Sequence, residues 1–411
     1  MNIIHKILSN PNGKQIIALY ISTIGGVLLG VLSSVINTRF LDPVNYGDVR
    51  YVQNLINLFS CIFLLGFFVS GSRLLAISKS KAEANGIKGV MVIFLIITIA
   101  ALMFMVLLCY FYHLLFQANM NAVLFLFSIP VCAQPLLLNY INTTAQGDNQ
   151  VGRIAYARLL PALLYVIAAY FIYSRYGASS ALMILLQWGI ACMILVAIVI
   201  STHPDFKEYK KYKQLLIEEN RRYGLYLYIG SLAMVATQYL PGVTLGFFNI
   251  DNRDVALFTL ALTISMPLSM LPSIVGTSYF KKFATQQCIN NKVFISTIII
   301  TLLSFLAYVA IIQPIVNFLY PVSYSQIGVY ASLLALSRCI YGIGDMVNRF
   351  LGAHGLGKEI RNASFATGFC MIVGSIVGVY FFNVWGAIAT NMVSSIVYFI
   401  VLFYYYKKFI R

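Results

Sequence analysis

The sequence predicts an all-α membrane protein that crosses the bilayer about twelve times. Apolar stretches of roughly 20 residues recur along all 411 residues, and a bilayer core about 30 Å thick needs a helix of that length. Hydrophobic residues make up 60% of the chain and charged residues only 10%, against about 25% in soluble domains. No connector is long enough to fold as a separate soluble domain.

Twelve apolar segments account for the expected spanning helices. They lie at 14–38, 49–76, 89–112, 121–145, 154–174, 180–202, 223–248, 254–279, 293–313, 326–353, 361–382 and 385–406. Prolines inside several of them predict kinks. These are Pro130, Pro135, Pro161, Pro241, Pro267 and Pro272.

The distribution of Lys and Arg predicts the orientation. Cytoplasmic loops of membrane proteins carry an excess of both residues. With the N-terminus inside, 20 of the 28 basic residues fall in cytoplasmic segments, and only Arg39, Arg50, Arg175 and Arg253 fall on the opposite side. We therefore expect both termini in the cytoplasm. The net charge of +16 then sets topology, and nucleic acid is not an expected partner.

The midpoint of the chain predicts a division into two lobes. The longest connector, 203–222, predicts a short amphipathic helix on the inner leaflet, where its lysines attract anionic lipids. A displacement of 206 residues aligns Asp48-Val49 with Asp254-Val255. Six helices on each side give lobes of parallel orientation with a substrate path between them. We expect lobes at 1–202 and 223–411, joined by a linker at 203–222.

The segment 326–353 carries the strongest candidate site. Arg338, Asp345 and Arg349 are spaced seven and four residues apart, so they fall within about 40° of one helical face. Arg338 lies roughly 18 Å from the outer end of this helix, at a depth where a charge needs a cavity or a partner. Two interpretations stay open, a cavity lining and an internal ion pair. Asp345 is the candidate residue for ion coupling.

Two further polar stripes lie at helical spacing. Helix 49–76 carries Arg50, Gln53, Asn54 and Asn57 at its outer end, and helix 121–145 carries Asn139, Asn142, Thr143 and Gln146 at its inner end. Such stripes either hold membrane helices together or line a hydrated interior. Arg73 and Arg158 lie near inner ends, where extension of the side chain to the membrane surface explains them.

The segment after the first helix resembles a known family. In "TRFLDPVNYGDVR", Arg39, Leu41, Pro43, Tyr46 and Gly47 match the Arg-x-Leu-Gly-Pro-x-x-Tyr-Gly motif of Wzx-type flippases, which are polysaccharide biosynthesis membrane proteins, while Asp42 replaces the usual glycine. The segments "LGFFVSGSRLLA" and "QGDNQVGR" also resemble this family.

The resemblance implies a fold, a location and a cargo. The fold is the MATE-like fold of the MOP exporter superfamily, with two six-helix lobes. The cargo is an undecaprenyl-diphosphate-linked oligosaccharide, such as an O-antigen unit of lipopolysaccharide biosynthesis, moved from the cytoplasmic to the periplasmic leaflet of the bacterial inner membrane. Membrane lipids and other glycan assembly proteins are the further expected partners, and no cofactor is expected.

Arginine suits this cargo because its guanidinium binds phosphate oxygens in pairs. The family motifs place Arg39 and Arg73 among the candidate substrate-binding residues. Physical reasoning adds Arg338, Arg349, Arg50, Arg253, Asn57 and Asn142.

Two alternatives to the flippase are weighed, and the drug exporter is the one that stays open. A cation-coupled drug exporter of the same superfamily usually carries more than one carboxylate inside the membrane, and here only Asp345 lies well inside. An enzyme is the other alternative, and it is not expected because the outer connectors are too short for a catalytic loop. No G-x-x-x-x-G-K-[ST] pattern occurs, which disfavours ATP-driven transport by this chain alone.

Overall fold

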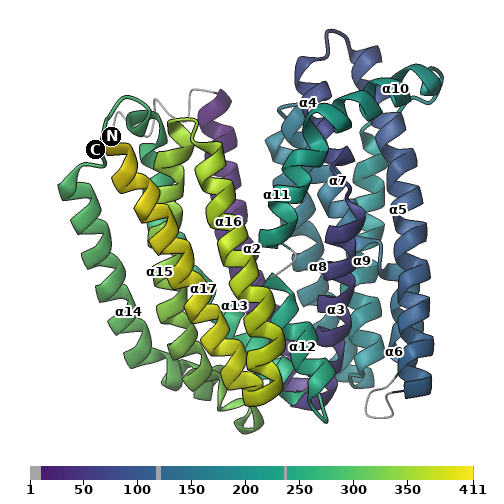
Figure 1. Cartoon of the computed structure of the whole chain (residues 1–411). Helices are drawn as coiled ribbons and strands as arrows, with labels where there is room; N and C mark the ends of the chain where they lie inside the picture. The colour runs from purple at the N-terminus through teal and green to yellow at the C-terminus, as the bar shows by residue number, and fades with distance from the viewer. Residues whose placement is uncertain (1–10, 117–121, 236–237, 411) are drawn as a thin grey trace. The chain divides into compact units, whose positions relative to one another are not determined.

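The computed structural model describes residues 11–116, 122–235 and 238–410. In these ranges the chain is helical apart from short turns (Figure 1), which confirms the all-α class. Each of the twelve predicted segments contains helix. Residues 1–10 and Arg411 lie outside the described part, and the cytoplasmic placement of both termini stays a prediction.

Clustering of contacts divides the chain into two compact units. Unit 1 comprises residues up to Leu41 together with Leu55–Ile229, and unit 2 comprises Asp42–Asn54 and Gly230–Arg411. The segment Asp42–Asn54 thus groups with unit 2, and the midpoint linker groups with unit 1. The lobe boundaries expected from the sequence stay a prediction.

Unit 1 contains the helices from α2 to the start of α11. Their bounds are α2 Pro11–Phe40, α3 Pro43–Phe63, α4 Phe67–Ile77, α5 Lys81–Phe116, α6 Val123–Ser128, η1 Ile129–Val131, α7 Gln134–Gly147, α8 Val151–Tyr176, α9 Ser180–Ser201, α10 Tyr209–Glu219, η2 Asn220–Gly224 and α11 Leu225–Val235.

Unit 2 contains the remaining helices, together with the first part of α3 and the last part of α11. Their bounds are α12 Leu240–Phe248, α13 Arg253–Phe283, α14 Asn291–Leu319, η4 Val322–Tyr324, α15 Ile327–Ala353, α16 Gly357–Val373, η5 Gly374–Gly378 and α17 Val379–Ile410.

The described residues contain eight helices that are long and apolar enough to cross a membrane, or nine if the bent pair α3–α4 forms one span. One of the eight runs over Gly357–Ile410, and it holds two consecutive helices because Asn383 has non-helical angles, φ 50° and ψ −130°. The multi-pass architecture is confirmed, and the count of twelve spans stays a prediction.

The expected helix 49–76 needs correction. It begins at Pro43 and breaks between α3 and α4, which are bent by 58°. Leu65 and Gly66 at the break have φ of 47° and 80°, a left-handed conformation that glycine adopts without strain. A side chain at Gly66 would also lie 2.6 Å from the backbone of Gly224. The close approach of the Gly66 and Gly224 backbones within unit 1 therefore fixes the bend. The hydropathy pattern does not predict this bend.

The prolines divide into two groups. Pro130 lies in η1, and Pro135 and Pro241 lie in the first turns of α7 and α12, so these three occur where a helix breaks or begins. Pro161 lies inside α8, and Pro267 and Pro272 lie inside α13. Only the first group coincides with an interruption of the helix.

The helix expected at 203–222 is present as α10. Its Tyr212 and Leu216 are buried, and Tyr212 packs over Gly86 at the start of α5, where any side chain would collide with its ring. Figure 1 shows α10 running across the ends of α4 and α5. The apolar side of the linker helix therefore packs on unit 1.

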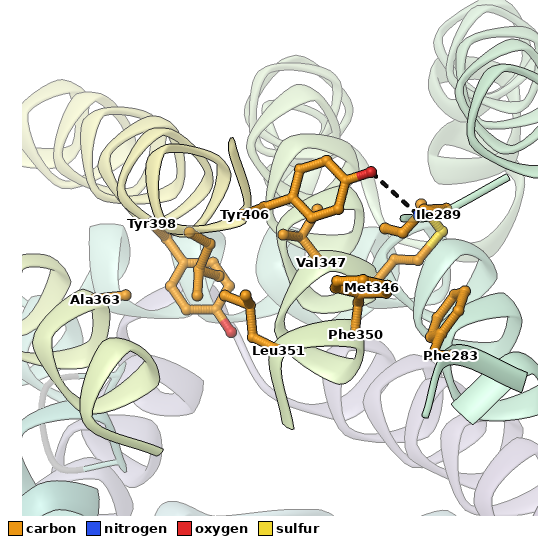
Figure 2. Packing of buried hydrophobic residues seen from close by; sticks show 10 residues of the cluster. Phe283, Ile289, Met346, Val347, Phe350, Leu351, Ala363, Tyr398 and Tyr406 are labelled. Atoms are coloured by element: carbon orange, nitrogen blue, oxygen red, sulfur yellow. Dashed lines mark hydrogen bonds between the residues drawn. The ribbon is translucent and has the colours of Figure 1, made fainter. Parts of the chain in front are cut away.

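The position of α15 in unit 2 is fixed from two sides. Added side chains at Gly342 and Gly276 would lie 2.7 Å from the Ser269 carbonyl oxygen and 2.9 Å from the Met346 Cα, so α13 and α15 pack with their backbones close, as small residues allow in membranes. Farther along, Phe350 packs with Phe283 and with the rings of α17 (Figure 2).

The same cluster also holds the connector between α13 and α14. The Ile289 backbone N–H donates a hydrogen bond of 3.1 Å to Tyr406 Oη (Figure 2). The half of α15 that follows Asp345 is therefore packed against both α13 and α17.

Candidate functional site

The charged residues of α15 lie on the side of the helix away from its exposed apolar face. Arg338, Asp345 and Arg349 fall within about 40° of one another, and Val329 and Leu333 fall roughly opposite. Both of these apolar side chains are exposed, as expected for a face toward lipid. The charged stripe therefore faces away from the hydrocarbon.

Asp345 is held by two partners within unit 2. Its Oδ2 accepts a hydrogen bond from Ser273 Oγ of α13 and lies 3.5 Å from Arg349 Nε, one turn along α15. The Asp345 side chain is 14% exposed and that of Arg349 is 46% exposed. Asp345 therefore pairs with Arg349 of its own helix.

Arg338 differs from Arg349 because no carboxylate of the described residues lies within 4.0 Å of its guanidinium. Its Nε is buried and has no hydrogen-bond partner. The neighbouring Ser337 is engaged, since its Oγ donates to the Asn391 carbonyl and contacts Ser395 Oγ at 2.9 Å. The Arg338 guanidinium thus has an N–H group beside the core that no described residue satisfies.

The polar stripe at the start of α3 forms an internal network in unit 2. Arg50 donates to Tyr46 Oη from Nε at 2.8 Å and to Gln53 Oε1 at 2.9 Å, and it also lies over the Tyr46 ring. Asp48 accepts from Asn252 Nδ2 at 2.8 Å. Arg50 is therefore placed by its own helix.

Arg73 forms an ion pair in unit 1. Its Nη1 lies 2.6 Å from Glu219 Oε1 at the end of α10, and its guanidinium lies over the Tyr223 ring. The side chain is 50% exposed. The pair joins the middle of α4 to the end of the linker helix.

The remaining candidates do not join either cluster. Arg39 is exposed in the last turn of α2, and Arg253 is exposed at the first residue of α13. Asn57 is half-buried in the unit 1 part of α3. Asn142 of α7 is also half-buried, and its Oδ1 has no hydrogen-bond partner. The structure thus pairs Asp345 with Arg349 and keeps Arg338 on the same face of α15, while Arg39, Arg253, Asn57 and Asn142 lie apart from them.

A cluster that sequence reasoning missed lies at the α7–α8 turn of unit 1. Lys88 of α5 is 5% exposed, and its Nζ lies 2.5 Å from Asp148 Oδ2. Arg153 approaches the same oxygen at 4.0 Å. Lys88 is one of the 20 basic residues that the sequence assigns to cytoplasmic segments. Its position beside Gly86 and Gly89, which pack against the linker, was the available signal for burial.

The sequence profile of the family described as "Polysaccharide biosynthesis protein" matches residues 13–280. The chain belongs to this family. A search of the curated proteins gives no match.

Solved structures show the fold. A structure of "Lipid II flippase MurJ, inward closed conformation" has a TM-score of 0.75 and 16% identity, covering 95% of this chain and 87% of that one. An inward-facing multidrug resistance MATE family transporter of the MOP superfamily has a TM-score of 0.68 and 18% identity, covering 96% and 98%. A MOP superfamily transporter from Pyrococcus furiosus has a TM-score of 0.59 and 16% identity, covering 100% and 99%.

These likenesses confirm the expected MATE-like fold of the MOP superfamily. The matched structures are a flippase and transporters by name, and the matched family serves polysaccharide biosynthesis. Both agree with a multi-pass transport protein rather than an enzyme.

Proposed function

We propose that this protein moves an undecaprenyl-diphosphate-linked oligosaccharide repeat unit, of O-antigen or a similar surface glycan, from the cytoplasmic to the periplasmic leaflet of a bacterial inner membrane. The single observation that carries the proposal is the guanidinium of Arg338 on α15, which has no carboxylate of the described residues within 4.0 Å and whose Nε has no hydrogen-bond partner. Membership in the polysaccharide biosynthesis family directs this cation toward a glycan carrier, whose head is a diphosphate.

The chemistry of the cargo fits the residues of α15. A diphosphate cannot cross hydrocarbon unaided, and a guanidinium offers it several N–H donors in a planar fork. Arg338 binds a phosphoryl group in this mechanism, and Arg349, close to the inner surface, meets the head first. The polyprenyl tail stays in lipid while the sugar passes through the protein by alternating access.

The membrane potential favours the outward step. Moving a charge of −2 from a negative interior is downhill by roughly 4.6 kcal/mol at about 100 mV. Export therefore needs no nucleotide, and ion coupling is required only if the return of the empty protein is slow.

A cation-coupled drug exporter is the second candidate, and the contacts of Asp345 weigh against it. That carboxylate already accepts from Ser273 and pairs with Arg349. A coupling carboxylate must exchange its ion during each cycle, and Arg349 competes with that ion for the same oxygen.

Reconstitution tests the function directly. Purified protein in vesicles is given a fluorescent undecaprenyl-diphosphate-linked sugar, and the fraction that becomes accessible to a quencher on the opposite side is followed in time. We expect translocation with the wild-type protein and background rates with empty vesicles. Export of a cationic dye together with no movement of the lipid-linked sugar would favour the drug exporter.

A further inference from the structure

The two faces of α7 in unit 1 differ in polarity and in exposure. The buried face carries Leu136, Leu137, Tyr140, Ile141, Thr144 and Ala145. The opposite face carries Asn139, Asn142, Thr143 and Gln146 at helical spacing, and each of these four is half-buried or exposed. We call the three carboxamides, Asn139, Asn142 and Gln146, the amide stripe.

The accessible face of α7 does not resemble a face toward lipid. No large apolar side chain of α7, which is described over its whole length, is exposed. The other long helices of the same unit expose such side chains, for example Ile96 and Phe104 on α5 and Met193 and Ile200 on α9. The amide stripe therefore faces water or a polar ligand rather than hydrocarbon.

The amide stripe extends well into the membrane. It lies on a helix long and apolar enough to cross the bilayer, Val123–Gly147. At 1.5 Å per residue, Asn139 lies about 12 Å from the inner end of α7 at Gly147. Lysine and arginine can reach the membrane surface from such a depth with their long side chains, but a short carboxamide cannot. Asn139 therefore needs hydrogen-bond partners at its own depth.

The fold does not supply partners for these amides. Among the described residues, no side-chain hydrogen bond joins the amide stripe to another helix. Thr143 Oγ1, on the same face, donates to carbonyl oxygens of its own helix. Asn142 Oδ1 is buried without a partner, which is costly because buried polar groups are nearly always paired. Of the two interpretations open from sequence, helix packing and a polar lining, these contacts favour the lining.

The chemistry of this face is uncharged. α7 contains no Lys, Arg, His, Asp or Glu, and Asp148, directly after it, is paired with Lys88. A carboxamide both donates and accepts hydrogen bonds, as a sugar hydroxyl does, whereas the guanidinium groups of α15 only donate. The amide stripe therefore suits a neutral ligand rich in hydroxyl groups better than a phosphate.

We propose that the amide stripe of α7 is a sugar-binding subsite, in which Asn139, Asn142 and Gln146 exchange hydrogen bonds with hydroxyl groups of the oligosaccharide. The proposal rests on the proposed function and deepens it, because it assigns recognition of the glycan to unit 1. The charged stripe of α15 in unit 2 then recognises the diphosphate. The residues of the amide stripe determine specificity for the sugar.

Binding of two lipids to the purified full-length protein in detergent tests the subsite. One lipid is undecaprenyl diphosphate, and the other is the lipid-linked oligosaccharide extracted from a host whose surface glycan depends on this protein. The wild type should bind the second about tenfold or more tightly, because each hydrogen bond contributes a factor of about two to ten. Asn139→Leu/Asn142→Leu should lose most of this preference and bind undecaprenyl diphosphate like the wild type.

Two further variants separate recognition from folding. Asn142→Gln keeps the amide, so it should retain more of the preference than Asn142→Leu does. Thr144→Val is the matched control on the buried face of the same helix, since Thr144 Oγ1 donates to the carbonyl oxygens of Tyr140 and Ile141. It should keep the full preference and a melting temperature near that of the wild type.

The outcomes distinguish the two proposals. Equal affinity of the wild type for both lipids would overturn the sugar subsite and leave the flippase proposal standing. Full preference in Asn139→Leu/Asn142→Leu would remove α7 from recognition of the glycan. Weaker binding of both lipids with a lowered melting temperature in this variant would identify a packing role and also overturn the subsite. Absence of binding of either lipid to the wild type would overturn both proposals.

Discussion

Lys88 in unit 1 and Arg338 in unit 2 are both cations inside helices of spanning length, yet their surroundings differ. Lys88 is nearly buried and lies 2.5 Å from Asp148. Among the described residues no carboxylate lies within 4.0 Å of the Arg338 guanidinium, and its Nε is unpaired. A buried cation with a short, direct partner is part of the packing, because removing either member leaves a charge stranded. A cation without one is available to a ligand.

The largest expected effect is on transport. Arg338→Ala should abolish surface glycan in a host that depends on this protein, with protein levels near normal, because the phosphoryl contact is lost while packing is retained. Arg338→Lys should restore part of the glycan, and Arg175→Ala should leave it unchanged. Glycan staining and immunoblotting of the same cells measure both quantities. Normal glycan in Arg338→Ala would remove α15 from the mechanism.

The next effect is on stability and concerns the other cation. Asp148→Asn should destabilise the protein by about 3–5 kcal/mol, the usual cost of breaking a buried pair. The double variant Lys88→Met/Asp148→Leu should recover most of the loss, since the buried charge of Lys88 is removed together with its partner and the side chain of Arg153 is 27% exposed. Thermal unfolding in detergent measures the change. If Asp148→Asn is as stable as the wild type, then water reaches Lys88, and the proposed difference between Lys88 and Arg338 is wrong.

Arg349 lies between these two cases, because it is half-exposed and paired with Asp345. Arg349→Ala should reduce surface glycan less than Arg338→Ala does, since its guanidinium already reaches water. If Asp345 acts only by placing Arg349, then adding Asp345→Asn to Arg349→Ala should cause no further loss. A larger defect in Asp345→Asn than in Arg349→Ala would instead give Asp345 a role of its own, such as ion coupling.

The smallest effect is expected at Arg73. Its pair with Glu219 is half-exposed, and such pairs contribute about 0–1 kcal/mol. Arg73→Gln and Glu219→Gln should therefore shift the melting temperature little and by similar amounts. Transport lost in Arg73→Gln and retained in Glu219→Gln would show that Arg73 contacts the cargo, as the family resemblance implies.

The candidate site was predictable in part. Helical spacing alone placed Arg338, Asp345 and Arg349 on one face, because 3.6 residues per turn is a local property. The partner of Asp345 on α13, Ser273, was not predictable, since it lies 72 residues away. The same holds for Glu219 beside Arg73 and for Asp148 beside Lys88.

The sequence by itself determined the multi-pass helical class and the residues that carry charge into the membrane, because hydrocarbon thickness and helical period act on local stretches of chain. Only the tertiary structure decided which of those charges are neutralised. It also fixed the bend at Gly66 and left the Asn142 Oδ1 atom of α7 unpaired. Burial and pairing depend on neighbours from distant segments, and the packing of small residues between helices determines which neighbours those are.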